Sequence, residues 1–249
     1  MTALALVHGV GLDRHMWDPF IDLWDGPVLS YDLIGLGEAP KPPGPYSLGD
    51  YSDQLRSVID TAGGGPVDVL GFSMGALVAQ RFAIDHPEMV RRLVLVSGVF
   101  DRSIAHRSAI LARVDDVRAG GYRAAIGPAL ERWFTPAFAA SHPEVVEATR
   151  RRMMDNDVES YVWAYDVFAT GDEQLVPLVD QIQARTLVIT GSDDERSTPE
   201  MAHLLAGALP AGRDIIVPGA RHLLPLEQPT ALVELVRDFL GDPFLEGER

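Results

Sequence analysis

The sequence predicts an α/β fold: a mostly parallel, doubly wound sheet of about six strands with helices on both faces. Most of the expected strands are continuous apolar runs, which is typical of parallel strands covered on both sides. Segments with helical periodicity separate these runs, and such alternation predicts a site at the carboxyl ends of the strands. The expected strands cover residues 3–8, 27–32, 67–72, 92–97, 185–190 and 213–218.

Two helices have clear boundaries in the sequence. In the segment 47–62 the apolar residues fall on one face, Ser47 suits an N-cap, and Asp50 follows it at the spacing of a capping box. The segment 230–241 repeats the same apolar spacing and finishes at Gly241, a typical C-terminal residue. Both segments are therefore expected to cover the sheet.

A long insert, residues 101–178, separates the fourth and fifth expected strands. It contains four helical patterns, no good strand and a mild excess of aromatic residues. We expect it to form a helical lid that excludes water from the site, with residues 1–100 and 179–249 forming the core domain. Four aromatic residues of the insert are candidates for the substrate pocket: Trp133, Phe134, Tyr161 and Tyr165.

The composition excludes several classes of protein. A chain of 249 residues with 47% apolar content can bury one large core. Its net charge of −15 argues against nucleic acid or anionic membranes as partners. There is no cysteine, which excludes thiol catalysis and disulfides, and no apolar run is long enough to span a membrane. Because the first apolar run lacks a basic segment before it and is needed as a strand, we expect no signal peptide and a cytoplasmic location.

The motif Gly71-Phe72-Ser73-Met74-Gly75 has the G-x-S-x-G pattern of a nucleophile elbow. It follows one expected strand and precedes an apolar, helix-like stretch, which is the structural context that the motif requires. The tight turn holds a serine hydroxyl clear of the sheet, at the positive end of the following helix. Ser73 is therefore the candidate nucleophile.

A second element of this chemistry follows the first expected strand. The loop His8-Gly9-Val10-Gly11 is of the type that supplies a backbone N–H to an oxyanion hole. The two donors would be the amides of Val10 and Met74, which would stabilise the oxygen that becomes negative when an acyl carbon turns tetrahedral. For His8 a structural role is expected, in which its ring hydrogen bonds support the loop.

The partners of a catalytic serine follow in a suitable order along the chain. Asp193 and Asp194 come after the fifth expected strand, and His222 comes after the sixth. Asp194 is preferred as the acid because it lies three residues past Gly191, although Asp193 is an alternative. The other histidines show no metal-ligand spacing, so no metal is expected, and a Ser-His-Asp mechanism requires no cofactor.

These residues resemble the α/β-hydrolase superfamily over nearly the whole chain. Besides the serine, aspartate and histidine motifs, Asp32-Leu33-Ile34-Gly35-Leu36-Gly37 is similar to the family's Asp-x-x-Gly-x-Gly loop. His222 with Glu227 and Pro229 is similar to its His…Glu-x-Pro ending. The resemblance implies the α/β-hydrolase fold, in which the family's first two strands are missing here.

Within the superfamily, the chain is most similar to 3-oxoadipate enol-lactonases. The similarity lies in the segments 15–19, 44–48, 132–138 and 143–146. In the last lid helix Ala169 stands where that group has an arginine. A cationic contact is therefore expected to be missing, which suits the carboxylate-bearing substrates of that group less well.

The resemblance implies a small-molecule substrate, a carboxylic ester or lactone, cleaved through an acyl-serine intermediate. Two alternatives remain open: a C–C bond hydrolase of ring-cleavage products with the same triad, and a non-catalytic hydrolase-like receptor. Without the family's first two strands, residues 27–32 become an exposed sheet edge. We expect this edge either to pair with a second subunit, giving a homodimer, or to be covered by a loop.

Overall fold

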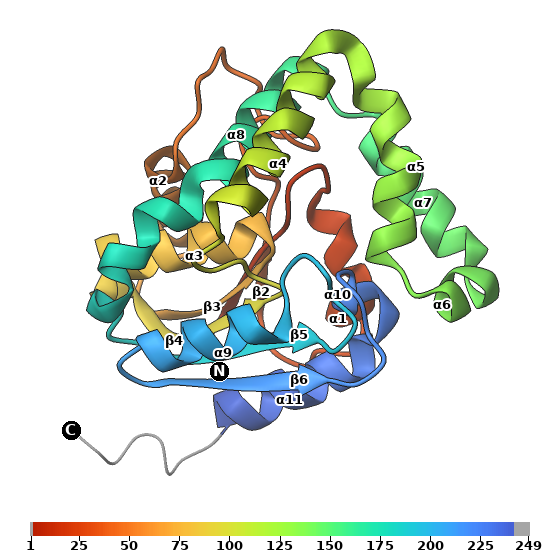
Figure 1. The fold of residues 1–249 in the computed structure, drawn as a ribbon. Coiled ribbons are helices and arrows are strands. Elements are labelled where there is room, and N and C mark those ends of the chain that lie inside the picture. The colour runs from red at the N-terminus through yellow and green to blue at the C-terminus, as the bar shows by residue number, and fades with distance from the viewer. Residues whose placement is uncertain (1, 242–249) are drawn as a thin grey trace.

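The structure is a computed structural model that describes residues 2–241. These residues contain one six-stranded parallel sheet in the order β2-β1-β3-β4-β5-β6 (Figure 1). Every expected strand is present, with ends shifted by at most two residues. The strands are β1 (Leu4–Val7), β2 (Val28–Ser30), β3 (Val67–Phe72), β4 (Val90–Val96), β5 (Arg185–Gly191) and β6 (Gly212–Val217).

Burial along the sheet explains why the strand pattern could be recognised. β1 and β3 are buried at every position, and β4 and β5 at every position but one. The edge strands β2 and β6 are mostly half-buried. The segment 27–32 therefore does form one edge of the sheet, as expected, although its strand is only three residues long.

Helices cover both faces of the sheet, as a doubly wound fold requires. α2 and α3 pack together on one face, and α1 and α11 pack together on the other (Figure 1). The capping box expected for α2 is present, since Ser47 and Asp50 exchange side-chain and backbone hydrogen bonds. These helices are α1 (Asp18–Ile21), α2 (Leu48–Thr61), α3 (Met74–Asp85), α9 (Pro199–Ala208), α10 (Leu224–Glu227) and α11 (Pro229–Gly241).

Five α-helices, not the four expected, lie between β4 and β5. The extra helix is α6, a short segment that begins after the N-cap Thr135 and ends before Pro143, so that it reads in the sequence as a loop. A π-helical turn at Val117–Gly121 joins the first two helices through Gly120, whose φ is 98°. The five helices are α4 (Ile104–Asp116), α5 (Tyr122–Trp133), α6 (Pro136–Ser141), α7 (Pro143–Met154) and α8 (Val158–Leu175).

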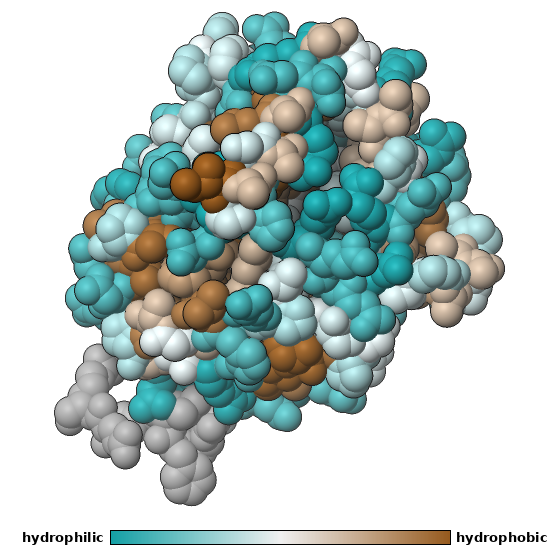
Figure 2. All heavy atoms as spheres, viewed as in Figure 1, coloured by the Kyte–Doolittle hydropathy of each residue, from teal (hydrophilic) through white to brown (hydrophobic). Residues whose placement is uncertain are grey.

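The α4–α8 segment forms two arms above the sheet (Figure 1). α4 and α8 lie side by side in one arm, and α5, α6 and α7 form the other. On the face viewed, hydrophobic residues occur as small separate patches on a largely hydrophilic surface (Figure 2). Among residues 2–241 no helix is both long and apolar enough to cross a membrane.

Candidate active site

Ser73 occupies a strained turn between β3 and α3. Its φ of 54° and ψ of −114° lie where non-glycine residues are rarely found. A Cβ atom on Gly71 would lie 2.2 Å from the carbonyl oxygen of Gly75, and one on Gly75 would lie 2.2 Å from that of Val7. Only glycine therefore fits on either side of the serine, which is the physical reason for the G-x-S-x-G pattern.

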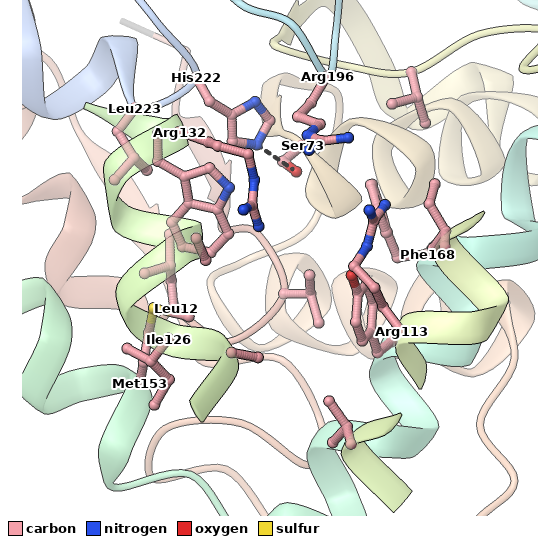
Figure 3. Close-up of a pocket in the computed structure, with 18 of the residues that line it drawn as sticks. Leu12, Ser73, Arg113, Ile126, Arg132, Met153, Phe168, Arg196, His222 and Leu223 are labelled. Carbon is pink, nitrogen blue, oxygen red and sulfur yellow. Dashed lines mark hydrogen bonds between the residues drawn. The ribbon is translucent and has the colours of Figure 1, made fainter. Parts of the chain in front are cut away.

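The structure brings Ser73, His222 and Asp194 together. His222 Nε2 lies 3.1 Å from Ser73 Oγ, and His222 Nδ1 lies 2.8 Å from Asp194 Oδ2 (Figure 3 shows the serine–histidine contact). The three residues are buried, with exposed fractions of 4%, 5% and 2% respectively. The imidazole also lies against the rings of Phe72 and Trp133, with centroids 5.2 and 5.9 Å away. Burial among apolar rings strengthens the hydrogen bonds that link Ser73, His222 and Asp194.

The two adjacent aspartates have different surroundings. Asp194 Oδ1 accepts hydrogen bonds from the amides of Arg196 at 2.8 Å and Ser197 at 3.0 Å, which leaves Oδ2 for the imidazole. Asp193 is exposed, and its carboxylate accepts a hydrogen bond from the Ser192 hydroxyl instead. Of the two candidates, only Asp194 therefore contacts His222.

Two serines and a glutamate hold in place the histidine loop, the segment 218–223 between β6 and α10 that carries His222. Ser97 Oγ donates to the carbonyl oxygen of His222 at 3.1 Å, and Ser197 Oγ donates to the carbonyl oxygen of Ser97 at 2.6 Å. Glu227 accepts from the amides of Arg221 at 2.8 Å and Thr135 at 2.6 Å. This carboxylate therefore connects the histidine loop to the start of α6.

The amides of Val10 and Met74 are available as donors. Among the described residues neither N–H has a hydrogen-bond acceptor, although Val10 is 8% exposed and Met74 is fully buried. Buried amides without acceptors are rare, so such a pair next to Ser73 suggests a site for an external oxygen. Asn156 stabilises the loop that follows β1, residues 8–11, because its side chain donates to the carbonyl oxygen of Gly11 at 2.9 Å.

His8 supports the loop rather than facing the pocket. Its Nε2 accepts a hydrogen bond from the Leu33 amide at 2.9 Å, so Nδ1 carries the proton and donates to the carbonyl oxygen of Gly9 at 2.8 Å. Complete burial lowers the pKa of His8 below its ordinary value. The ring is therefore neutral and holds together the segments that follow β1 and β2.

A pocket of about 130 Å³ lies in front of Ser73, between the two arms of the α4–α8 segment (Figure 3). Three of the four expected aromatic residues line it: Trp133, Tyr161 and Tyr165. Phe134 does not; it is buried, and its ring stacks on Phe138 in the next helix. α5 ends at Trp133, and Phe134 follows it with an extended backbone (φ −104°, ψ 146°), so its side chain leaves the chain in a different direction from that of Trp133.

Four arginines also line the pocket, so cations are present there although the contact expected to be missing at position 169 is absent. They are Arg102, Arg113, Arg132 and Arg196. Ala169 is completely buried and does not line the pocket, so the residue at that position does not decide the charge of the cavity. Within residues 2–241 no group of three or more metal-ligating side chains is present.

The model of the Alpha/beta hydrolase family matches residues 4–235 of the chain. The chain belongs to the α/β-hydrolase family. This hydrolase is 30% identical over 241 residues to the (E)-2-((N-methylformamido)methylene)succinate hydrolase of Acinetobacter baylyi, an alignment that covers 95% of this chain and 89% of that protein.

Solved structures of similar proteins have the same fold as this hydrolase. An enol-lactonase from Burkholderia xenovorans superposes with a TM-score of 0.89 at 27% identity, covering 97% of this chain and 92% of that one. A thermophilic esterase from Thermogutta terrifontis, solved with malate bound, superposes with a TM-score of 0.88 at 28% identity, covering 97% and 90%. The expected resemblance to the superfamily is therefore confirmed.

Several residues of this α/β hydrolase were not identified from the sequence. Ser97 has a φ of 48° and supports the histidine loop, and no motif marks it. Ser197 was missed because its hydroxyl bonds to Ser97, 100 residues away, which no local pattern indicates. Arg113 and Arg196 lie in segments that are distant in the sequence, and no local pattern indicates that they face one pocket.

Proposed function

We propose that this protein is a cofactor-independent serine hydrolase that cleaves a small carboxylic ester or lactone through an acyl-serine intermediate. The observation that carries the proposal is the continuous hydrogen-bond chain from Ser73 through His222 to Asp194, beside two amides without acceptors. Nucleophile, base and orienting acid are thus in the arrangement that acyl transfer requires.

Each residue has a defined role in this mechanism. Ser73 Oγ attacks the carbonyl carbon while His222 Nε2 takes its proton, and Asp194 stabilises the imidazolium that forms. The amides of Val10 and Met74 stabilise the oxyanion, each contributing on the order of 3 kcal/mol to the transition state. His222 then protonates the departing alcohol oxygen and activates the water that releases the acyl group from Ser73.

We further propose that residues 101–178 act as a lid on a core domain of residues 1–100 and 179–249, of which residues 1 and 242–249 lie outside the described part of the chain. The support for this division is that the pocket lies between Ser73 and helices α4, α5 and α8. Water is excluded by these helices, which strengthens the electrostatic interactions inside the pocket.

Two relatives support an ester or lactone as the bond that is cleaved: an enol-lactonase and an esterase solved with malate bound. The substrate in the name of a third relative, a substituted succinate, contains no ester or lactone, so that relative supports only hydrolysis of a small molecule that carries carboxylates. The cavity of about 130 Å³ suits a small acyl or alcohol group rather than a long chain.

The test uses p-nitrophenyl acetate with wild type, Ser73→Ala and, as a matched control, the exposed helix residue Ser57→Ala. Wild type and Ser57→Ala should turn over repeatedly, and Ser73→Ala should lose at least about 10³-fold in kcat. Mass spectrometry should detect an acetyl group on Ser73 in rapidly quenched wild type. An unchanged rate in Ser73→Ala would exclude the mechanism.

The same samples separate the alternatives. Faster cleavage of a vinylogous diketone than of any ester would assign the site to C–C bond hydrolysis with the same triad. A single turnover followed by slow product release would indicate a receptor rather than an enzyme.

A further inference from the structure

The charges that line the pocket are unequal. Within the described part of the chain, four arginines line the cavity but only one carboxylate does, that of the exposed residue Glu195. Arg102 is neutralised within the protein, because its guanidinium lies 2.6 Å from Asp172 Oδ1 and both groups are buried. Three guanidinium groups and one exposed carboxylate remain.

Among residues 2–241 the side chains of Arg113, Arg132 and Arg196 form no hydrogen bond or ion pair. All three are half-buried, and Arg132 Nε is a fully buried atom without a partner. Acidic residues outnumber basic ones by 36 to 21 in this chain, so carboxylates are not scarce. The lack of an ion-pair partner for these arginines is therefore a property of the pocket, although Glu195 also lines it.

The positive charges of the three arginines interact with one another. Burial, followed by the charges of Arg196 and Arg113, lowers the pKa of Arg132. A guanidinium nevertheless remains charged in proteins, so the three positive charges repel one another. Such repulsion in a half-buried site destabilises the unliganded protein, and a bound anion would relieve it.

The three groups come from different parts of the fold. Arg113 lies on α4, Arg132 on α5 and Arg196 in the loop between β5 and α9, and they approach the pocket from separate sides (Figure 3). The amide of Arg196 also binds Asp194, so its side chain extends from the loop that orients the base. An anion held by all three would therefore connect the two arms of the α4–α8 segment to the loop between β5 and α9 that carries Asp194.

We propose that Arg113, Arg132 and Arg196 form an anion subsite, and that the substrate is a small ester or lactone carrying two free carboxylates besides the bond that is cleaved. This inference rests on the proposed hydrolase function and specifies its substrate class. The three positive charges of these guanidinium groups, minus the one negative charge of Glu195, leave two positive charges, which two carboxylates would balance. Arginine suits this role because its planar donors bind carboxylates in pairs.

The first experiment compares three acetyl esters that differ in charge: 2-propyl acetate, O-acetyllactate and O-acetylmalate. They release the same acetate and carry zero, one and two carboxylates. For the wild type we expect kcat/KM to rise by about tenfold or more with each carboxylate. In Arg132→Gln the ratio of O-acetylmalate to 2-propyl acetate should fall by about 10- to 100-fold. Arg123→Gln, an exposed change on the same helix with the same loss of charge, should keep the ratio.

The second experiment measures binding without turnover. In Ser73→Ala, malate should raise the melting temperature more than lactate does at equal ionic strength, and adding Arg113→Gln or Arg196→Gln should abolish the difference. Equal rates for the three esters together with no effect of malate would overturn the subsite and leave the serine mechanism intact. Stabilisation of Ser73→Ala by malate, together with no cleavage of any of the three esters by the wild type, would support the subsite and overturn the proposed function.

Discussion

Asp194 and Asp193 are neighbours with the same side chain, and their hydrogen bonds assign them different roles. Only Asp194 contacts His222, and its second oxygen is held by two backbone amides. Asp194→Asn is expected to lower kcat for p-nitrophenyl acetate by about 10³- to 10⁴-fold, because an amide no longer stabilises the imidazolium or selects its tautomer. Asp193→Asn is the control and should stay within about twofold. A larger loss in the control would transfer the role to Asp193.

His8 predicts a pH dependence of stability. Both ring nitrogens are engaged, and burial lowers the pKa of the folded residue below the ordinary value of 6.5. Below that value the unfolded chain binds a proton that the folded chain does not, so the free energy of unfolding falls as the pH falls from 6.5 toward the folded pKa. One such proton contributes a slope of at most about 1.4 kcal/mol per pH unit.

Urea unfolding at pH 7, 6 and 5.5 measures this slope. His8→Gln should unfold more readily at pH 7 but lose less stability on acidification than wild type does. The exposed residue His142 provides the control, and His142→Gln should keep the wild-type slope. Equal slopes in His8→Gln and wild type would show that His8 is not the group responsible.

At the scale of elements, Glu227 connects α10 to two loops that carry the site. Its carboxylate binds the amide before His222 and the amide that precedes α6. Glu227→Ala leaves both donors without an acceptor, so it is expected to cost about 2–4 kcal/mol in the free energy of unfolding and to lower kcat. Urea denaturation and ester turnover test this. Glu234→Ala, an exposed change on α11, should stay within about 0.5 kcal/mol; an equal loss there would contradict the role of Glu227.

The sheet could be predicted element by element because each strand, cap and turn is determined by residues that are close together in the sequence. The strands are buried runs, Ser47 and Asp50 mark the start of α2, and the glycines around Ser73 are imposed by backbone contacts. The inserted helices were predicted less well, since α6 is short and lies between two prolines at its boundaries, Pro136 and Pro143. Short helices are stabilised by neighbours rather than by their own sequence.

The sequence predicted the three residues that follow the ends of strands, Ser73, Asp194 and His222, and three of the four aromatic residues expected in the pocket. It did not predict Arg113 and Arg132, which lie on helices whose relative placement is a tertiary property. The absence of a carboxylate partner is likewise visible only in three dimensions. Ala169 therefore indicated the lack of one cation but not the charge of the whole pocket, because arginines from other segments line it.

At the scale of the whole molecule, opposite charges are separated. The chain has a net charge of −15, while its pocket contains three arginines without acidic partners. Excess negative charge on the surface favours solubility and discourages binding of nucleic acid. The surface and the pocket therefore impose different requirements on the sequence, which explains why overall composition did not reveal the charge of the pocket.

We propose that the sheet edge formed by β2 either pairs with a second subunit or is covered by a loop, and the first alternative predicts a homodimer. β2 pairs with β1 on one side only, so its outer side offers unpaired backbone groups to a second copy of β2. Light scattering should then give a mass of twice the 27.1 kDa of one chain, falling on dilution. Hydrogen exchange of Val28, Leu29 and Ser30 should slow as the protein concentration rises. A constant monomer mass with exchange independent of concentration would exclude pairing and leave only the covering loop.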